Sequence, residues 1–358
     1  MSRIFADNFV LLLQCGSREN ALERLQALDA ALETVLHGRQ RGYHIVFSSG
    51  VYFLTREDAN LKAAVDRAHY AKDLSKGSYS SMVTVYSEQI KQVIADEKEI
   101  EGMMGDALKN GEFRPYFQAK VDVVTRKIVG AEALTRWVHP KKGIIPPGKF
   151  IPFFEKNGFV VRLDRYIFEE VCRLIRQWLD LGIDVPPISC NFSRLHFINE
   201  AFPEELKAVV DRYRLPADLL ELEITESVAM EKIEDISRYI ERLRSYGFRI
   251  AIDDFGVGYS SLSVLDQIPI DVLKLDRNFF LKGADDNVGC AVIRCLVVLA
   301  HTIGIEIVCE GIETDEQERL LRNMDCRIAQ GFKYARPIPA EAFRTLLREH
   351  AGAGLEGA

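Results

Sequence analysis

Eight polar residues lie within or at the end of short apolar runs, where side chains normally pack into a core. They are Glu132, Asn191, Glu223, Asp253, Asp254, Lys274, Glu310 and Gln330. Any one of them alone could be a helix cap or a surface group, but together they come from seven separate runs. Such repeated placement favours one shared site at the end of a set of strands.

The five carboxylates of this group predict bound metal, because like charges in one pocket raise each other's pKa unless cations neutralise them. Two divalent cations would neutralise most of that charge. The amide oxygen of Asn191 suits a hard cation such as Mg²⁺ or Mn²⁺. Lys274 would stay charged and hold an attacking water or a developing oxyanion, or would instead form a structural salt bridge to Asp276 or another carboxylate. Sites of this kind commonly hydrolyse phosphoesters.

Asp253 and Asp254 are adjacent, so in a continuing strand their side chains would point to opposite faces. Both can reach one centre only if the strand ends there. Gly256 and Gly258 allow that bend, because glycine tolerates positive φ. Taken alone, the same segment could be a tight turn with a capping aspartate.

The alternation of faces along a strand places Glu132 and Arg136 on the same side of their run. A carboxylate suited to metal and a guanidinium suited to phosphate would then line one wall of the site. The alternative is a plain Arg–Glu ion pair at the rim.

The elements that must position these residues follow a regular rhythm after residue 101. The apolar runs that predict strands are Arg114–Val121, Ile128–Trp137, Pro187–Phe192, Leu219–Thr225, Arg249–Asp254, Val272–Asp276, Ile305–Glu310 and Arg327–Gly331. Between them, helical patterns occur at Arg162–Leu181, Lys232–Tyr246, Val288–Thr302 and Asp315–Arg322, and Pro146-Pro147-Gly148 begins another helix. This pattern predicts an α/β fold, a TIM-like (β/α)8 barrel. The first two runs are joined by only a short turn, so they form a hairpin and the first strand is antiparallel.

The chain before residue 101 has a different pattern and predicts a separate small α/β domain over residues 1–86. Short alternating runs at 3–13 and 43–53 predict strands, and 20–36 and 58–74 predict helices. The polar stretch 87–101 predicts a linker helix, residues 102–350 form the barrel domain, and 351–358 form a C-terminal tail.

Composition excludes several classes of protein. The chain has 358 residues, 47% hydrophobic and 28% charged, with a net charge of −7, which disfavours DNA or an anionic membrane as a partner. Its seven cysteines show no metal-ligand spacing and suit reduced thiols in the cytoplasm. The longest apolar stretch, residues 292–312, is interrupted by Arg294 and Glu306 and is not expected to cross a bilayer. We also expect no signal peptide.

Seven ordered motifs resemble those of the EAL-domain cyclic di-GMP phosphodiesterases. They are Glu132-Ala133-Leu134-Thr135-Arg136-Trp137, Asn191-Phe192-Ser193, Glu223-Ile224-Thr225-Glu226, the segment from Asp253 to Ser261, Lys274-Leu275-Asp276, Glu310-Gly311-Ile312-Glu313 and Gln330-Gly331-Phe332. The match covers about residues 102–350. Val257 stands where Thr is commoner and Gln118-Ala119-Lys120 where Gln-Pro-x is commoner, and neither change removes an implied ligand.

The resemblance implies a role for each matched position. The implied ligands of a first metal are Glu132, Asn191, Glu223 and Asp253, and those of a second are Asp253, Asp254 and Glu310. Lys274 would position the nucleophilic water, and Glu310 is either a ligand or a general base. Leu134, Arg136 and Gln330 would contact the bound dinucleotide or its metals. Glu226 would hold the loop formed by residues 255–261.

The function implied is hydrolysis of cyclic di-GMP to the linear dinucleotide pGpG with Mg²⁺ or Mn²⁺, by a bacterial signalling protein that is a homodimer. The alternative is a catalytically inactive cyclic di-GMP receptor. The complete set of carboxylates favours the enzyme, since a receptor needs no two-metal site.

The first 86 residues resemble the C-terminal half of a GGDEF (diguanylate cyclase) domain. Residues 5–9, Phe-Ala-Asp-Asn-Phe, align with the signature, so that both glycines and the catalytic carboxylate are replaced. Ser49-Gly50-Val51 and the segment 68–72 match later structural positions. We therefore expect a degenerate, partial GGDEF-like domain without cyclase activity.

Overall fold

A computed structural model describes residues 2–5, 8–37, 47–56, 58, 60–73, 82–230, 233–256, 265, 267–280 and 287–350. Contacts within the chain divide it into two units, Met1–Gly102 and Met103–Ala358. Among the described residues, no helix has both the length and the apolar character that a bilayer span requires.

The second unit is a closed barrel of eight strands, as predicted. They are β5 (Phe113–Asp122), β6 (Ile128–His139), β8 (Ile188–Asn191), β9 (Leu220–Thr225), β10 (Arg249–Phe255), β11 (Val272–Leu275), β12 (Glu306–Cys309) and β13 (Ile328–Gln330). The first strand, β5, is antiparallel to both of its barrel neighbours, β6 and β13. Each of the other neighbouring pairs is parallel. Two short strands were not predicted, β7 (Gly143–Ile145) beside β6 and β14 (Ile338–Pro339) beside β5.

The turn between β5 and β6 explains the antiparallel start. The Asp122 carboxylate accepts hydrogen bonds from the backbone N–H groups of Val124 and Thr125, at 2.9 and 2.6 Å. Arg126 then adopts φ 63°, in the left-handed region. This short aspartate-stabilised turn reverses the chain without a crossover helix, so the two strands form the predicted hairpin.

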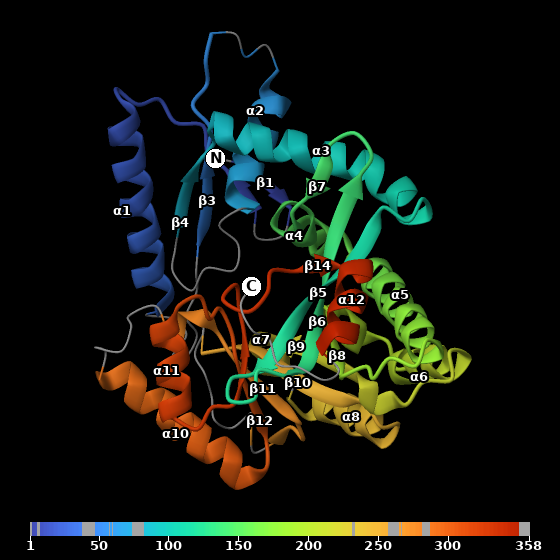
Figure 1. Ribbon diagram of the computed structural model, residues 1–358. Helices are drawn as coiled ribbons and strands as arrows, with labels where there is room; N and C mark the ends of the chain where they lie inside the picture. The colour runs from blue at the N-terminus through green and yellow to red at the C-terminus, as the bar shows by residue number, and fades with distance from the viewer. Residues whose placement is uncertain are drawn as a thin grey trace. The chain divides into compact units, whose positions relative to one another are not determined.

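Helices cover the outside of the barrel (Figure 1). They are α4 (Pro147–Asn157), α5 (Val160–Asp180), α6 (Phe202–Arg212), α7 (Glu226–Met230), α8 (Ile233–Ser245), α10 (Asn287–Ile303), α11 (Asp315–Asn323) and α12 (Ala340–His350), with 3-10 turns η1 (Arg194–Ile198), η2 (Ala217–Leu219) and η3 (Arg277–Phe280). The four fully predicted helices are α5, α8, α10 and α11, and α4 begins at the predicted proline pair. The sequence analysis did not predict α6, α7 or α12, although α6 is the crossover helix between β8 and β9 and α12 follows β13.

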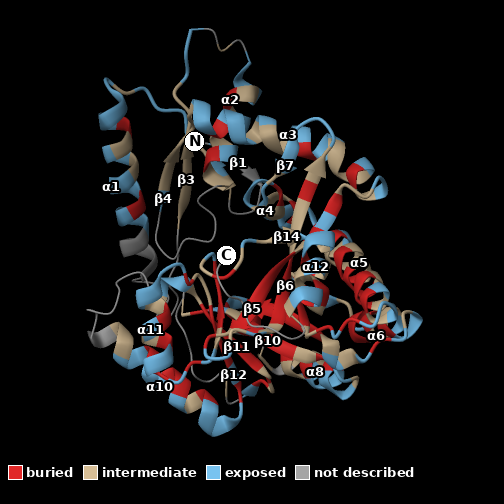
Figure 2. Ribbon diagram, viewed as in Figure 1, coloured by how far each residue is buried: buried red, intermediate tan, exposed pale blue. Residues whose placement is uncertain are grey.

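Burial is concentrated in the barrel strands and on the inward face of α5 (Figure 2). Aromatic side chains fill the space between strands and helices. Phe117 of β5 stacks on Phe343 of α12 with ring centroids 5.2 Å apart, and Trp178 of α5 meets Phe117 edge-on at 5.2 Å. All three side chains are at most 2% exposed. This tight outer packing fixes the strands, and so the positions of the polar groups inside the barrel.

The first unit contains two small sheets. A hairpin of β1 (Ser2–Phe5) and β2 (Asn8–Val10) forms one, and the parallel pair β3 (Ser48–Val51) and β4 (Met82–Val85) forms the other. The predicted helices correspond to α1 (Arg18–His37) and α2 (Leu61–Asp73), whereas β4 was not predicted. Gly50 lets α2 approach β3 closely, since a Cβ there would lie 1.9 Å from the Ala68 carbonyl oxygen.

The predicted linker helix forms, but it continues further than the sequence suggested. Helix α3 spans Glu88–Lys109, whereas the predicted helix ended at residue 101. The helix-forming residues Met103, Met104, Ala107 and Leu108 extend the run. Ala107 is buried, so packing as well as propensity supports the last turns.

Candidate active site

Seven of the eight polar positions converge at the C-terminal ends of the barrel strands. Glu132 lies on β6, Asn191 ends β8, Glu223 lies on β9, Asp253 on β10 and Lys274 on β11, Glu310 follows β12, and Gln330 ends β13. In a parallel barrel these ends meet at one face, where loops leave room for a ligand. The sequence prediction of one shared site is therefore matched by the arrangement of the strands.

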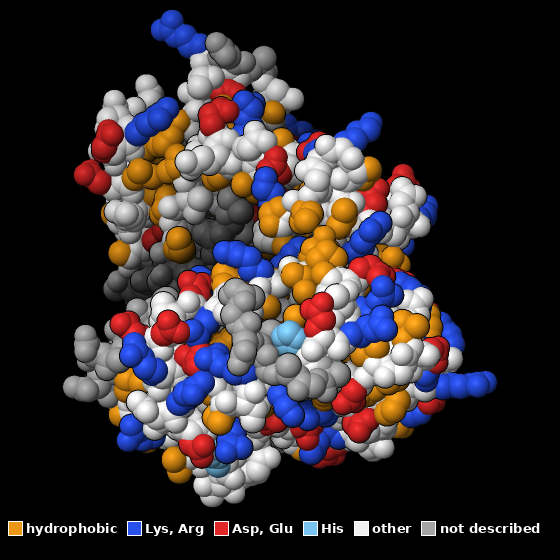
Figure 3. Space-filling view, viewed as in Figure 1, with side chains coloured by type: hydrophobic (Ala, Val, Ile, Leu, Met, Phe, Trp, Pro, Cys, Tyr) orange, Lys and Arg blue, Asp and Glu red, His pale blue; other side chains and the backbone are white. Residues whose placement is uncertain are grey.

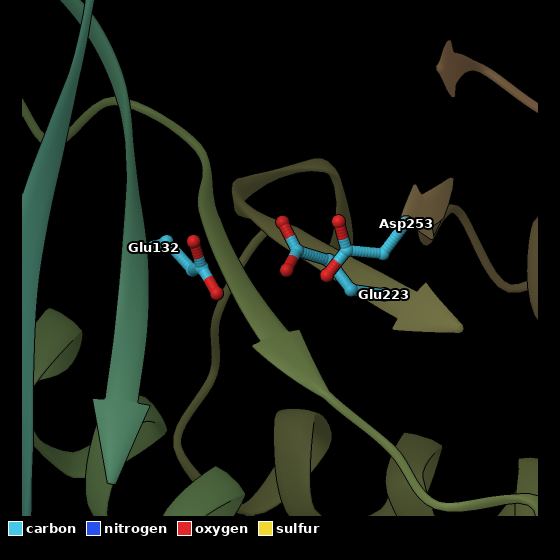
Figure 4. A group of neighbouring side chains, drawn as sticks. All are labelled: Glu132, Glu223 and Asp253. Atoms are coloured by element: carbon cyan, nitrogen blue, oxygen red, sulfur yellow. The ribbon is translucent and has the colours of Figure 1, made fainter. Parts of the chain in front are cut away.

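Three carboxylates form the centre of the site. One oxygen each of Glu132, Glu223 and Asp253 lies within 4.8 Å of the others, and the three side chains point toward one another from β6, β9 and β10 (Figure 4). Glu223 is fully buried and Glu132 is 5% exposed. This group of three, here called the carboxylate cluster, is a donor set suited to a hard divalent cation.

Lys274 lies among these carboxylates and is fully buried. Its Nζ is 2.7 Å from Glu310, 2.8 Å from Glu223, 3.2 Å from Asp253 and 3.5 Å from Glu132. Although burial lowers the pKa of Lys274, the four carboxylates outweigh it and raise that pKa well above its ordinary value. The surrounding carboxylates thus favour the charged form of Lys274, and its ion-pair partners are these four carboxylates rather than Asp276.

Amide side chains orient Glu132. Asn191 Nδ2 donates to Glu132 Oε1 at 2.8 Å, and Gln330 Nε2 donates to Glu132 Oε2 at 2.6 Å. The same Gln330 nitrogen lies 3.1 Å from Gln118 Oε1. Asn191 and Gln330 thus reach the cluster through Glu132, which ties β8 and β13 to β6.

Burial makes the remaining negative charge of the cluster unfavourable. Burial raises the pKa of Glu132 and of Asp253, and it raises that of Glu310 to about 8 although Lys274 opposes the rise. For Glu223 the balance reverses, because Lys274 and Lys120 overcome burial and lower its pKa to about 2. More carboxylates than ammonium groups therefore share one buried space. That excess, together with oxygen donors within reach of one point, fits a divalent cation.

Asp254 does not join the carboxylate cluster. It adopts φ 56° and is exposed, and its backbone N–H donates to Asp253 Oδ1 at 2.9 Å. The bend that the sequence assigned to Gly256 and Gly258 begins at Asp254 itself and continues at Gly256, where φ is 97°. Gly258 lies outside the described residues. The two adjacent aspartates therefore point to different surroundings, and only Asp253 lies in the cluster.

Glu226, at the start of α7, holds the end of β10. Its Oε2 accepts a hydrogen bond of 3.1 Å from the Gly256 N–H, and the side chain is buried. This contact is consistent with the loop-holding role that the sequence suggested. Residues 257–261 of that loop, Val257 included, lie outside the described residues.

Leu134 and Arg136 are half-buried on the same strand as Glu132. Arg136 Nη1 donates to the Thr135 carbonyl oxygen at 3.0 Å, and burial lowers the pKa of its guanidinium. The remaining guanidinium donors leave Arg136 able to bind an anionic group.

Sequence reasoning missed a second buried lysine beside the cluster. Lys120 of β5 lies 2.6 Å from Glu221 and 3.1 Å from Glu223, and each of the three side chains is at most 6% exposed. The available signal was the alternation of Gln118 and Lys120 with the apolar residues Phe117, Ala119 and Val121, which places both polar side chains on one face.

Comparison with known proteins agrees with this geometry. Residues 102–337 match the family model of the EAL domain. The chain belongs to the EAL-domain family. The curated relatives of this EAL chain include MucR of Pseudomonas aeruginosa, a bifunctional diguanylate cyclase/cyclic di-GMP phosphodiesterase, 33% identical over 350 residues, covering 95% of this chain and 50% of MucR. The oxygen sensor protein DosP of Escherichia coli is 30% identical over 274 residues, covering 76% of this chain and 34% of DosP. The chain thus spans about half the length of MucR, and less of DosP.

Solved structures also resemble this EAL chain. The phosphodiesterase of PaMucR in complex with c-di-GMP has a TM-score of 0.65 and 37% identity, covering 68% of this chain and 99% of that one. The EAL enzyme Bd1971, bound to cAMP and cyclic-di-GMP, has a TM-score of 0.67 and 25% identity, covering 92% of this chain and 79% of that one. The degenerate GGDEF-like assignment of residues 1–86 stays a prediction, and Ala6 and Asp7 of its signature lie outside the described residues.

Proposed function

We propose that this chain hydrolyses cyclic di-GMP to pGpG with bound Mg²⁺ or Mn²⁺. The observation that carries the proposal is the carboxylate cluster around Lys274 at the C-terminal end of an EAL barrel. The similarity to the PaMucR phosphodiesterase in its c-di-GMP complex supports the choice of substrate. Cytoplasmic bacterial second-messenger signalling is the setting that this substrate implies.

The proposed metal ligands are those that the resemblance to the EAL-domain family implies, and Glu132, Glu223 and Asp253 of that set lie together in the carboxylate cluster. Glu132, Asn191, Glu223 and Asp253 would hold one ion, and Asp253, Asp254 and Glu310 would hold the second. Metal supplies a water of lowered pKa and stabilises the charge that develops on phosphate oxygens. Since Asp254 is exposed outside the cluster, we expect the second ion to bind with lower affinity than the first.

The other residues bind and position the substrate. Lys274, charged and close to Glu310, would hold the attacking water by hydrogen bonding. Glu310, 2.7 Å from Lys274, would either hold the second ion or receive the proton of that water. The water oxygen forms a bond to phosphorus as the bond from phosphorus to the 3′ oxygen breaks, and the 3′ oxygen is protonated. Arg136 would bind a phosphate and Leu134 would contact the dinucleotide.

The purified chain incubated with cyclic di-GMP and Mg²⁺ tests the proposal, with pGpG followed by chromatography. The control is Glu132→Ala, which removes a proposed ligand from the cluster. Product from the wild type alone is the expected result. Tight binding of intact cyclic di-GMP without any product would instead favour the alternative, a catalytically inactive receptor.

For the rest of the chain we propose a GGDEF-like remnant over residues 1–86 without cyclase activity, a linker over 87–101, an EAL barrel over 102–350 and a tail over 351–358. We also propose a homodimer formed through the barrel, with neither DNA nor membrane as a partner. On the face of the molecule in Figure 3, acidic and basic side chains are interspersed over the barrel unit. A mixed surface of this kind does not favour binding to DNA or to an anionic membrane. Light scattering of the purified protein tests the dimer, and a monomeric mass would reject it.

A further inference from the structure

The two oxygens of Glu223 are held by two different lysines. Lys274 Nζ lies 2.8 Å from Glu223 Oε2, on the side of the carboxylate cluster. Lys120 Nζ lies 3.1 Å from the other oxygen, Oε1. One lysine comes from β11 and the other from β5, so the two ammonium groups approach the carboxylate from separate strands.

Lys120 is itself fixed by a second carboxylate. Its Nζ lies 2.6 Å from Glu221 Oε1, and Glu221 Oε2 lies 3.4 Å from Arg249 Nε. Arg249 also pairs with Glu306 at 3.0 Å. Buried charges of alternating sign therefore run from Glu221 through Lys120 and Glu223 to Lys274. Because solvent does not screen these pairs, moving Lys120 away from Glu223 would leave a buried charge without its partner.

The two lysines differ in what else they contact. Lys274 pairs with Glu132, Asp253 and Glu310 as well as with Glu223, so it can give up Oε2 and remain paired. Within the described part of the chain, the ion-pair partners of Lys120 are Glu221 and Glu223. Oε2 is therefore the oxygen that a cation in the cluster can take, whereas Oε1 stays with Lys120.

We propose that Lys120 is a positioning residue that makes Glu223 a one-oxygen metal ligand and so favours Mg²⁺ and Mn²⁺ over Ca²⁺. Ca²⁺ takes roughly six to eight oxygen ligands and often uses both oxygens of a carboxylate, whereas Mg²⁺ requires a compact octahedral set. An oxygen held by a buried ammonium is not available for two-oxygen binding. The inference rests on the metal site of the proposed function.

The test measures metal binding without substrate. Metal-stripped protein is titrated with Mg²⁺, Mn²⁺ and Ca²⁺ by isothermal titration calorimetry, and the ratio of the Ca²⁺ to the Mg²⁺ dissociation constant is compared between variants. The main variant is Lys120→Met combined with Glu221→Gln, which removes one positive and one negative charge and leaves the net charge unchanged. We expect this ratio to fall about tenfold or more, because Glu223 becomes free to bind Ca²⁺ through both oxygens.

Two further variants separate the selectivity effect from charge and folding. Glu221→Gln alone keeps Lys120 on Glu223, and Lys120→Arg keeps a cation on Oε1, so both are expected to retain the wild-type ratio within about twofold. An unchanged ratio in the double variant, or an equal fall in Lys120→Arg, would overturn the inference. Wild-type protein that binds none of the three ions would instead reject the proposed metal site itself.

Discussion

The two units of the chain differ in what fills their interiors. In the barrel, large side chains such as Trp137, Phe113 and Phe150 are fully buried. In the first unit, the buried apolar side chains among the described residues are Ala21, Ala64, Ala71, Ile90 and Ile100. Larger ones stay exposed there, such as Leu12 at 70% and Leu61 at 63%. The barrel unit therefore has the larger apolar core, and the cluster of buried carboxylates and lysines lies inside it.

One carboxylate in each unit has a strongly shifted pKa, and the two shifts go in opposite directions. In the first unit, the Thr55 N–H and hydroxyl, Tyr52 and Arg67 hydrogen-bond Asp58, and they hold its pKa down at about 2, although burial opposes them. In the barrel, burial raises the pKa of Glu310 to about 8. Glu223 of the barrel also has a pKa of about 2, because Lys274 and Lys120 pair with it, so the high pKa of Glu310 reflects burial that its cationic partner does not fully offset.

The largest difference between the units is expected when one cationic side chain is removed from each and the losses in the free energy of unfolding are compared. Lys274→Met would leave four carboxylates around an uncharged side chain. We expect loss of detectable turnover and a free energy of unfolding lower by about 3–5 kcal/mol in metal-free protein. Arg67→Met, whose side chain is 39% exposed, should change that free energy by less than about 1 kcal/mol. Urea denaturation and the chromatographic assay measure both, and equal costs in the two units would refute the comparison.

Truncation of an apolar side chain is expected to give nearly as large a difference in stability cost between the units. Phe117→Ala removes a ring stacked between α5 and α12, and we expect it to cost about 3–5 kcal/mol of stability because the rigid surroundings cannot close the cavity. Its counterpart in the first unit, Leu12→Ala, removes an exposed side chain. Thermal or urea unfolding should show that the second change costs less than about 0.5 kcal/mol. A large cost for Leu12→Ala would mean that the first unit is packed more tightly than the structure shows.

A smaller effect is expected at the edge of the active site. Glu226→Ala removes the acceptor of the Gly256 N–H and so loosens the end of β10 that carries Asp253. Because Glu226 acts through the backbone and not on the substrate, we expect turnover to fall by about 10–100-fold. Binding of cyclic di-GMP should change much less. Turnover at the wild-type level would show that this hydrogen bond does not position the site.

Features that follow from the order of the strands could be predicted from the sequence, whereas features that depend on barrel closure or on one backbone angle could not. The converging motif residues were predictable, because parallel strands of known order bring their ends together. The alternation along β5 indicated the face on which Lys120 lies, but its ion-pair partners were not predictable, since only closure of the barrel between β5 and β13 brings its strand opposite Glu221 and Glu223. The separation of Asp253 from Asp254 was also hidden, because it depends on a left-handed φ that an aspartate adopts less readily than a glycine.

Removal of metal tests the central claim most directly. The purified chain is stripped with EDTA, and hydrolysis of cyclic di-GMP is followed before and after Mg²⁺ or Mn²⁺ is added back. If the carboxylate cluster acts through bound cations, turnover disappears on stripping and returns with either ion. Undiminished hydrolysis in excess EDTA would contradict the account, because the buried carboxylates would then serve the reaction without metal.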